Sequence, residues 1–139
     1  MAGRVNLSRR SERGQALAEF ALVLPLVLFF IAGIIEFGRA WNIKQAVTDA
    51  AREGARYAVV QDAKITTDTV RAKVEERLAL ASIDSSTIDI TGAFHTPGGE
   101  MTVAVTTGYR MGLVGVLLNW AGAPSVVPIS TQVTMRSEW

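Results

Sequence analysis

A charge-free apolar run from Phe20 to Ile35 constrains the fold of this chain more than any other feature. With residues 16–18 before it, the run reaches roughly the 20 residues that a helix needs to cross a bilayer. We predict a transmembrane helix over residues 15–36. About 100 residues remain, enough for one small domain with a modest core.

The charges on either side of the run predict its orientation. Arginines outnumber acids in residues 1–14, whereas the charges after the run are mixed in sign. Because basic residues on a short N-terminal side keep that side cytoplasmic, we expect a single-pass protein with an extracytoplasmic C-terminal domain. The run also exceeds the apolar core of about 7–15 residues of a secretory signal and continues into "EFGRAWNIKQ" without a small-residue cleavage site. We expect no cleavage after the run.

Helical periodicity continues beyond the run to about Val60. Apolar residues, including Phe37 and Trp41, recur there at three- and four-residue steps, as on an amphipathic helix, and charged residues including Glu36 mostly fall between them. We therefore predict an amphipathic extension over residues 37–60. Ala50, Gly54 and Ala58 form a ridge of small residues on it, suited to close helix packing. The ridge is expected to contact either another helix in lipid or the chain's own sheet, and the sheet is the favoured alternative.

Residues 61–139 alternate between helical and strand patterns. A second helix is predicted from about Asp68, with Thr67 or Asp68 as its cap, to about Ala81. Alternating segments around Ile88, from Met101 to Thr106 and from Val127 to Met135 predict strands, and "GLVGVLLNWAGAP" predicts one short helix. The fold class is thus α+β: a long N-terminal helix, transmembrane and then amphipathic, with a small C-terminal antiparallel sheet domain.

The sequence carries no pattern of residues typical of catalysis. It has no cysteine, no cluster of metal ligands, no phosphate-binding glycine loop and no nucleophile motif. Its one histidine, His95, lies in the turn cluster "HTPGG" and is interpreted as a loop residue. Charges of both signs balance along the helix, which argues against nucleic-acid binding. We expect no catalytic residue, no metal, no cofactor and no small-molecule substrate.

Glu19 places a carboxylate at the start of the apolar run, where it costs several kcal/mol unless it is paired or near the interface. One interpretation is that its side chain reaches the headgroups. The other starts from a cut between Gly14 and Gln15, which would make Glu19 the fifth residue of the mature chain. The new α-amino group could then pair with Glu19 of its own or a neighbouring subunit.

The second interpretation resembles a prepilin, because "RGQALAEF" is similar to the class III signal that a prepilin peptidase cuts after glycine. Over residues 14–60 the chain also resembles the TadE-like family of tight-adherence (Tad, or Flp) pilus systems. The features that carry this resemblance are Pro25, "IIEFGRA", "AAREGARYA" and, more loosely, "PGGEMTVAVTTGYRM" and "TMRSE". The chain is too short for TadG-like relatives, whereas a TadF-like relative stays an alternative.

The resemblance implies a minor pilin or pseudopilin without enzymatic activity that takes part in pilus assembly and adhesion. Residues 1–14 would be a basic leader, Gly14 and Gln15 the cleavage site, and Glu19 with Phe20 the assembly contact. The implied partners are the prepilin peptidase, other pilin or pseudopilin subunits, the Tad inner-membrane assembly platform and inner-membrane lipid. The implied location is the bacterial inner membrane, with incorporation into an extracellular pilus.

The sequence also suggests structural roles for Pro25 and for one of the tryptophans. Pro25 removes a backbone N–H and is expected to bend the helix, either as a tolerated membrane proline or as a break that adapts the helix to a filament. Trp41 is expected in the aromatic belt of the membrane interface, while the sequence assigns no role to Trp120 or Trp139. The alternative to a pilin is an uncleaved, signal-anchored binding protein whose outer domain stands on a helical stalk.

Overall fold

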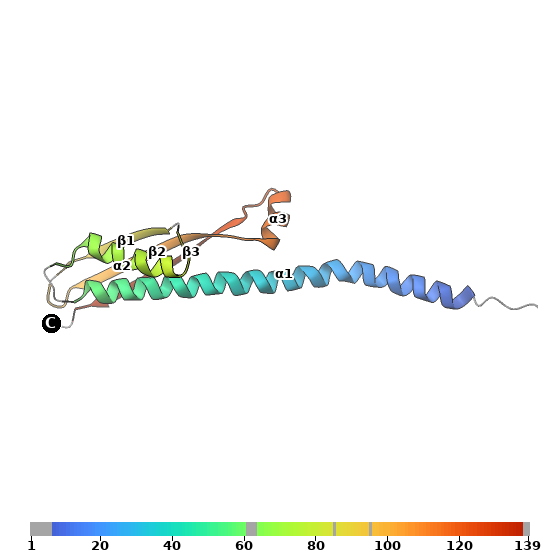
Figure 1. Cartoon of the computed structure of the whole chain (residues 1–139), viewed down its shortest axis with the longest axis horizontal. Coiled ribbons are helices and arrows are strands. Elements are labelled where there is room, and N and C mark those ends of the chain that lie inside the picture. Colours follow the sequence, from blue (N-terminus) through green and yellow to red (C-terminus); the bar gives the residue numbers. More distant parts are fainter. Residues whose placement is uncertain (1–6, 61–63, 85, 95, 138–139) are drawn as a thin grey trace, which may run out of the picture. The chain divides into compact units, whose positions relative to one another are not determined.

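The structure is a computed structural model, and it describes residues 7–60, 64–84, 86–94 and 96–137, with the side chains of α1 from Gly14 onward. The elements in chain order are α1 (Leu7–Ala58), α2 (Thr67–Leu80), β1 (Ser86–Gly92), β2 (Glu100–Arg110), α3 (Leu113–Trp120) and β3 (Val126–Arg136) (Figure 1). The chain divides into two compact units, Met1–Ile35 and Glu36–Trp139. Helix α1 contributes to both.

In the first unit, α1 exposes almost all of its apolar side chains. Leu22 is 80% exposed and Phe30 is 64% exposed, and the other large hydrophobic residues of the run are between 38% and 71% exposed. This part of α1 is long and apolar enough to cross a membrane by length and composition. Since so large an apolar surface is not stable in water, it requires lipid or other apolar helices around it.

In the second unit, one stripe of α1 forms one side of the hydrophobic core. The stripe follows the steps of three and four residues that keep side chains on one helix face. Its buried apolar members are small, which lets other elements approach the helix axis closely. They are Val47, Ala50, Ala51, Ala55 and Ala58.

Helix α2 begins with a capping box. Thr66 is the N-cap, its hydroxyl accepts a hydrogen bond from the Thr69 N–H at 3.4 Å, and the Thr69 hydroxyl accepts one from the Thr66 N–H at 2.8 Å. The predicted caps, Thr67 and Asp68, were therefore wrong by one and two positions. The reason is that the threonine at 69 completes a reciprocal pair with Thr66.

The three strands form an antiparallel sheet in the order β1-β2-β3. Ile88 pairs with Val105 across β1 and β2, and Val103 pairs with Val133 across β2 and β3. Along β2 the buried positions alternate with half-buried ones from Met101 to Thr107, so one face of the sheet belongs to the core. That core also holds the stripe of α2, which is Val70, Val74 and Leu78.

Helix α3 lies in the connection between β2 and β3. It lies beyond the end of the sheet at which β2 ends and β3 begins (Figure 1). The carbonyl oxygen of Ser125 accepts a hydrogen bond from the Met111 N–H at 2.9 Å, which joins the two ends of this connection. Strand β3 then returns along β2, and Lys44 of α1 donates a hydrogen bond to its Ser130 carbonyl.

The predicted fold class is confirmed: a long N-terminal apolar helix is followed by two more helices and a three-stranded antiparallel sheet. The expected positions of charge on α1 need one correction, because Glu36 is buried at 5% exposure. Phe37 and Trp41, expected on the apolar face, are 69% and 57% exposed and stack on each other. The buried stripe of α1 therefore includes Glu36, the residue before Phe37, and excludes Phe37 and Trp41.

We predict that Gly54→Ala destabilises the domain although alanine favours helix. A Cβ at Gly54 would overlap Val74 Cγ2 and lie 3.5 Å from Val103 Cγ1. Overpacking of this kind costs about 1–3 kcal/mol, and the helix-propensity gain of about 1 kcal/mol offsets only part of it. Thermal unfolding of the full chain in detergent should show a lower midpoint. Gly38→Ala is the matched control, because nothing lies within 4 Å of its Cβ position, and a loss of stability equal to that of Gly54→Ala would contradict the packing argument.

Candidate functional site

The predicted cleavage and assembly residues lie on one exposed stretch of α1. Gly14, Gln15 and Glu19 are all exposed, and Phe20 is 61% exposed. The Gln15 amide donates a hydrogen bond to Glu19 Oε1 at 3.1 Å, one helical turn away. The side chain of Gln15 thus partners this carboxylate. The main chain on either side of the Gly14–Gln15 bond is helical and uncovered by other described residues.

Pro25 lies inside α1, between residues that are helical on both sides. A proline at an interior position leaves the carbonyl four residues earlier, that of Ala21, without its helical N–H donor. The surrounding residues are apolar and exposed. The bend predicted at Pro25 stays a prediction.

The ridge residues Ala50, Gly54 and Ala58 are buried within the second unit. The position of a Cβ on Gly54 faces Val74 of α2 and Val103 of β2. These contacts belong to the chain's own core, and they leave no space on this face for a helix of another subunit.

The second unit contains a polar site that the sequence did not predict, centred on the Glu36 carboxylate. Tyr109 donates its hydroxyl hydrogen to Glu36 Oε2, and the Leu113 N–H donates to Glu36 Oε1 at 2.5 Å. Charge-assisted bonds of this kind are shorter and stronger than neutral ones. They join α1, at the start of the second unit, to the end of β2 and to the first turn of α3.

Tyr109 is 8% exposed, and its hydroxyl points into this site. Burial raises the pKa of Tyr109, and the hydrogen bond to the Glu36 carboxylate raises it further, because a phenolate beside a carboxylate is doubly unfavourable. Tyr109 is therefore a persistent donor at neutral pH. In the described part of the chain, every buried side-chain nitrogen or oxygen has a hydrogen-bond partner, so this site is fully satisfied.

A usable signal for Glu36 was present in the sequence. Counting back from Val47 by four, three and four residues gives Ile43, Ala40 and Glu36, so the acid occupies the same stripe as the core. The prediction missed it because an acid was assumed to mark the solvent side. Its partners come from 73 and 77 residues away along the chain. The local pattern does not contain such distant pairs.

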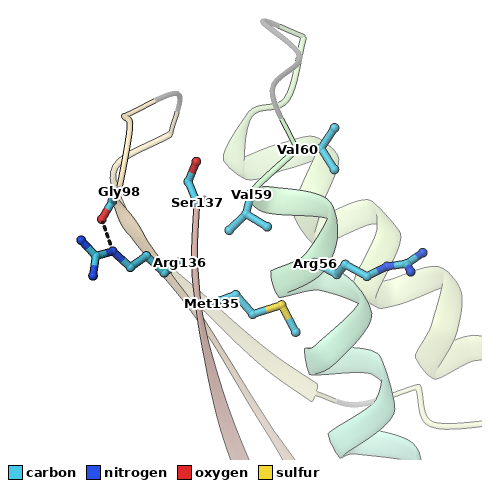
Figure 2. A pocket seen from close by; sticks show the side chains of 7 residues that line it. All are labelled: Arg56, Val59, Val60, Gly98, Met135, Arg136 and Ser137. Carbon is cyan, nitrogen blue, oxygen red and sulfur yellow. Dashed lines mark hydrogen bonds between the residues drawn. The ribbon is translucent and has the colours of Figure 1, made fainter. Parts of the chain in front are cut away.

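A pocket lies where α1 and β3 end (Figure 2). It is lined by Arg56, Val59, Val60, Gly98, Met135, Arg136 and Ser137. Figure 2 shows Val59 and Met135 facing the space between helix and strand, whereas Arg56 extends away from the strands. Arg136 donates to the Gly98 carbonyl at 3.0 Å, and Arg56 lies 3.6 Å from Glu53. These seven residues include one hydroxyl and no base or acid to activate it, so the pocket does not form a catalytic arrangement.

The remaining candidates do not form a site among the described residues. Within the searched part of the chain, no three histidine, cysteine or acidic side chains are close enough to hold a metal ion. Asp84 and Asp89 are exposed, consistent with a solvated loop and strand edge. His95, Trp139 and residues 1–6 of the predicted leader lie outside the described residues.

Comparison with known proteins finds a family match over part of the chain. A family model described as TadE-like protein matches residues 14–56, which confirms the resemblance that the motifs of this segment indicated. The match begins at Gly14 and ends within the α1 stripe that forms the core. Neither the curated proteins nor the solved structures include a match to this chain.

We predict that Tyr109→Phe lowers the free energy of unfolding at neutral pH by about 1.5–3 kcal/mol, because it removes a bond to a buried carboxylate. The folded pKa of Tyr109 is raised, so its contribution is complete below the unfolded value of about 10 and is lost as the pH rises through the folded value. Unfolding curves of the full chain in detergent should therefore show an alkaline loss of stability that Tyr109→Phe diminishes. Tyr57→Phe, at a 36% exposed tyrosine, should leave that loss unchanged. Equal alkaline profiles for Tyr109→Phe and the unmodified chain would refute the role given to Tyr109.

Proposed function

We propose that this chain is a TadE-like minor pilin or pseudopilin that a prepilin peptidase processes for Tad/Flp pilus assembly. The observation that carries the proposal is the family match over residues 14–56, which starts at the glycine before the expected cut. Association with a Tad pilus follows from the family at a coarse level. The cleavage, the contacts and the adhesive role are the proposed details.

The first step of the proposal is cleavage between Gly14 and Gln15. Gly14 is exposed, and nothing lies within 4 Å of its Cβ position. A protease needs such an uncovered segment, and a basic leader on the cytoplasmic side would place it before a cytoplasmic active site. The apolar part of α1 stays attached to the product and keeps the mature subunit in the inner membrane.

The second step is the use of Glu19 as an assembly contact. Cleavage would turn the backbone nitrogen of Gln15 into an α-amino group, which has an ordinary pKa of about 7.7–8.0 and is largely charged at neutral pH. Gln15 already lies one turn from the Glu19 carboxylate, at 3.1 Å between side chains. Among packed helices, that cation and the carboxylate of the same or a neighbouring subunit would compensate each other. Phe20 would add apolar contact next to the pair.

The third step assigns the outer domain to partner choice. Residues 36–137 carry the folded core, and their sheet leaves one face outside that core. In this proposal that domain meets other pilin subunits and the Tad assembly platform on the outer side of the inner membrane. The chain acts there as a structural component without catalysis, cofactor or small-molecule substrate.

We predict that co-expression with its prepilin peptidase shortens the membrane-bound chain by residues 1–14. Intact-mass measurement of the product should give an N-terminus at Gln15, and Gly14→Leu should prevent the shortening, because a large side chain obstructs the residue before the cut. Gly33→Leu is the matched control, since Gly33 lies in the same helix with nothing within 4 Å of its Cβ position, and it should be cut normally. A full-length product in the presence of the peptidase would favour the uncleaved, stalk-anchored binding protein instead.

We predict that Glu19→Ala leaves cleavage intact and lowers incorporation of the subunit into the sheared pilus fraction by about tenfold or more. The expectation follows because an amino group left unpaired in an apolar core costs about 3–5 kcal/mol. Quantitative immunoblotting of the membrane and sheared fractions measures the effect. Asp49→Ala, at an exposed acid further along α1, is the control. Unchanged incorporation of Glu19→Ala would remove Glu19 from the assembly contact and support the interpretation that it reaches the headgroups.

A further inference from the structure

We propose that α3 is a second membrane contact, which lies in the outer headgroup layer of the bilayer that α1 crosses. The proposal rests on the membrane span in α1. It requires neither the cleavage nor the pilus. In this proposal lipid covers the exposed face of α3. The alternative partner is a second copy of the chain, and the experiment below distinguishes the two.

The first argument is the exposed apolar stripe on α3. Its members are spaced i, i+3, i+4 and i+7, which places them on one face of a helix. All are at least half exposed, and Trp120, at 90%, is the most exposed large hydrophobic residue among the described ones. The stripe consists of Leu113 at 54%, Val116 at 71%, Leu117 at 51% and Trp120.

The inward side of α3 is apolar as well: Val114, Gly115 and Leu118 are half-buried or buried, and the exposed Asn119 is the one polar side chain of the helix. A helix that is apolar on nearly all sides is normally covered on nearly all sides. In the described residues, the outward side of α3 has no such cover. A short helix with this composition at the surface of an extracytoplasmic domain therefore indicates an apolar partner outside the chain.

The second argument is the depth at which α3 is held. The Leu113 N–H donates to Glu36 Oε1 at 2.5 Å, and Glu36 follows directly on the last residue of the apolar run. One residue of helix rises 1.5 Å, whereas the headgroup layer is about 5–8 Å thick on each side of the hydrocarbon. The start of α3 is therefore tied to the residue that enters this layer. Within the second unit, α3 is thus bonded to the residue that directly follows the apolar run.

The third argument is the charge pattern around α3. From Met111 to Met135 the chain carries no charged residue. Two arginines stand next to this stretch: Arg110 is exposed, and Arg39 Nη1 lies 3.4 Å from the Cβ position of Gly112. Cationic side chains beside an apolar surface are typical of segments that lie in the headgroup region of a membrane. Phe37 and Trp41, exposed and stacked at 6.1 Å, add aromatic groups to the adjoining turns of α1.

Tryptophan fluorescence tests the contact on the full chain. The protein with Trp41→Phe and Trp139→Phe keeps Trp120 as its one tryptophan, which is excited at a wavelength that the tyrosines do not absorb, and is reconstituted into phosphatidylethanolamine and phosphatidylglycerol vesicles. Replacing part of the lipid by lipid brominated close to the headgroup should quench about half or more of the Trp120 emission, since an indole at that depth contacts the bromines. A second protein with Trp120→Phe and Phe29→Trp in the same background reports on the span, and lipid brominated deep in the chains should quench it.

The outcomes distinguish lipid, water and a second copy of the chain as the surroundings of Trp120. Quenching of Trp120 together with the reporter at position 29 supports the proposal. Unquenched, water-like emission from Trp120 beside a quenched reporter overturns it while leaving the membrane span intact. Blue-shifted but unquenched emission that reverts to water-like emission on dilution of protein in lipid also overturns it, and assigns the stripe to a second copy. An unquenched reporter shows that the chain does not span the vesicle membrane and removes the basis of the proposal.

Discussion

The close approach of other elements to the small-residue stripe of α1 is the contact on which the folded unit depends. Ala50, Gly54 and Ala58 present almost no side chain, so Val74 of α2 and Val103 of β2 pack almost directly onto the helix backbone. Larger residues would hold the sheet away and open a gap along the core. Helix α1 thus follows two different rules along its length: bulky exposed residues in the apolar half, and small buried residues in the half that carries the domain.

The buried Glu36 carboxylate marks the change between those halves. A buried acid is tolerated only when its oxygens are hydrogen-bonded, and here Tyr109 and the Leu113 N–H supply the donors. Because one donor belongs to β2 and the other to α3, the carboxylate fixes three elements at one point. An apolar residue in its place would leave the Tyr109 hydroxyl and an N–H of α3 without these acceptors.

The sequence predicted most of the fold because most of it follows from local periodicity. The stripe Val70, Val74 and Leu78 gave α2 within one residue at each end, and alternation gave the central strand. Where the prediction was wrong, the cause was a contact that periodicity does not encode. The cap of α2 moved to Thr66 because of a reciprocal pair of side chains.

The polar site was missed for a related reason. Glu36 was assigned to the solvent side by its chemistry, although the spacing of the core stripe includes it, and its partners are distant in sequence. Phe37 and Trp41 were counted among the recurring apolar residues of the amphipathic helix, although the spacing counted back from Val47 includes Glu36 and excludes them. Spacing counted from a core residue was therefore a better guide than the apolar or charged character of each residue.

The position of the core along α1 has a consequence for the order of maturation. Every residue of the described core cluster follows Glu36 in the chain, beginning with Ile43 and Val47. Removal of residues 1–14, as proposed, would therefore delete no contact of the described core, and folding of the second unit uses none of these residues. Under the proposed cleavage, a chain that folds first and a chain that is cut first would give the same folded unit.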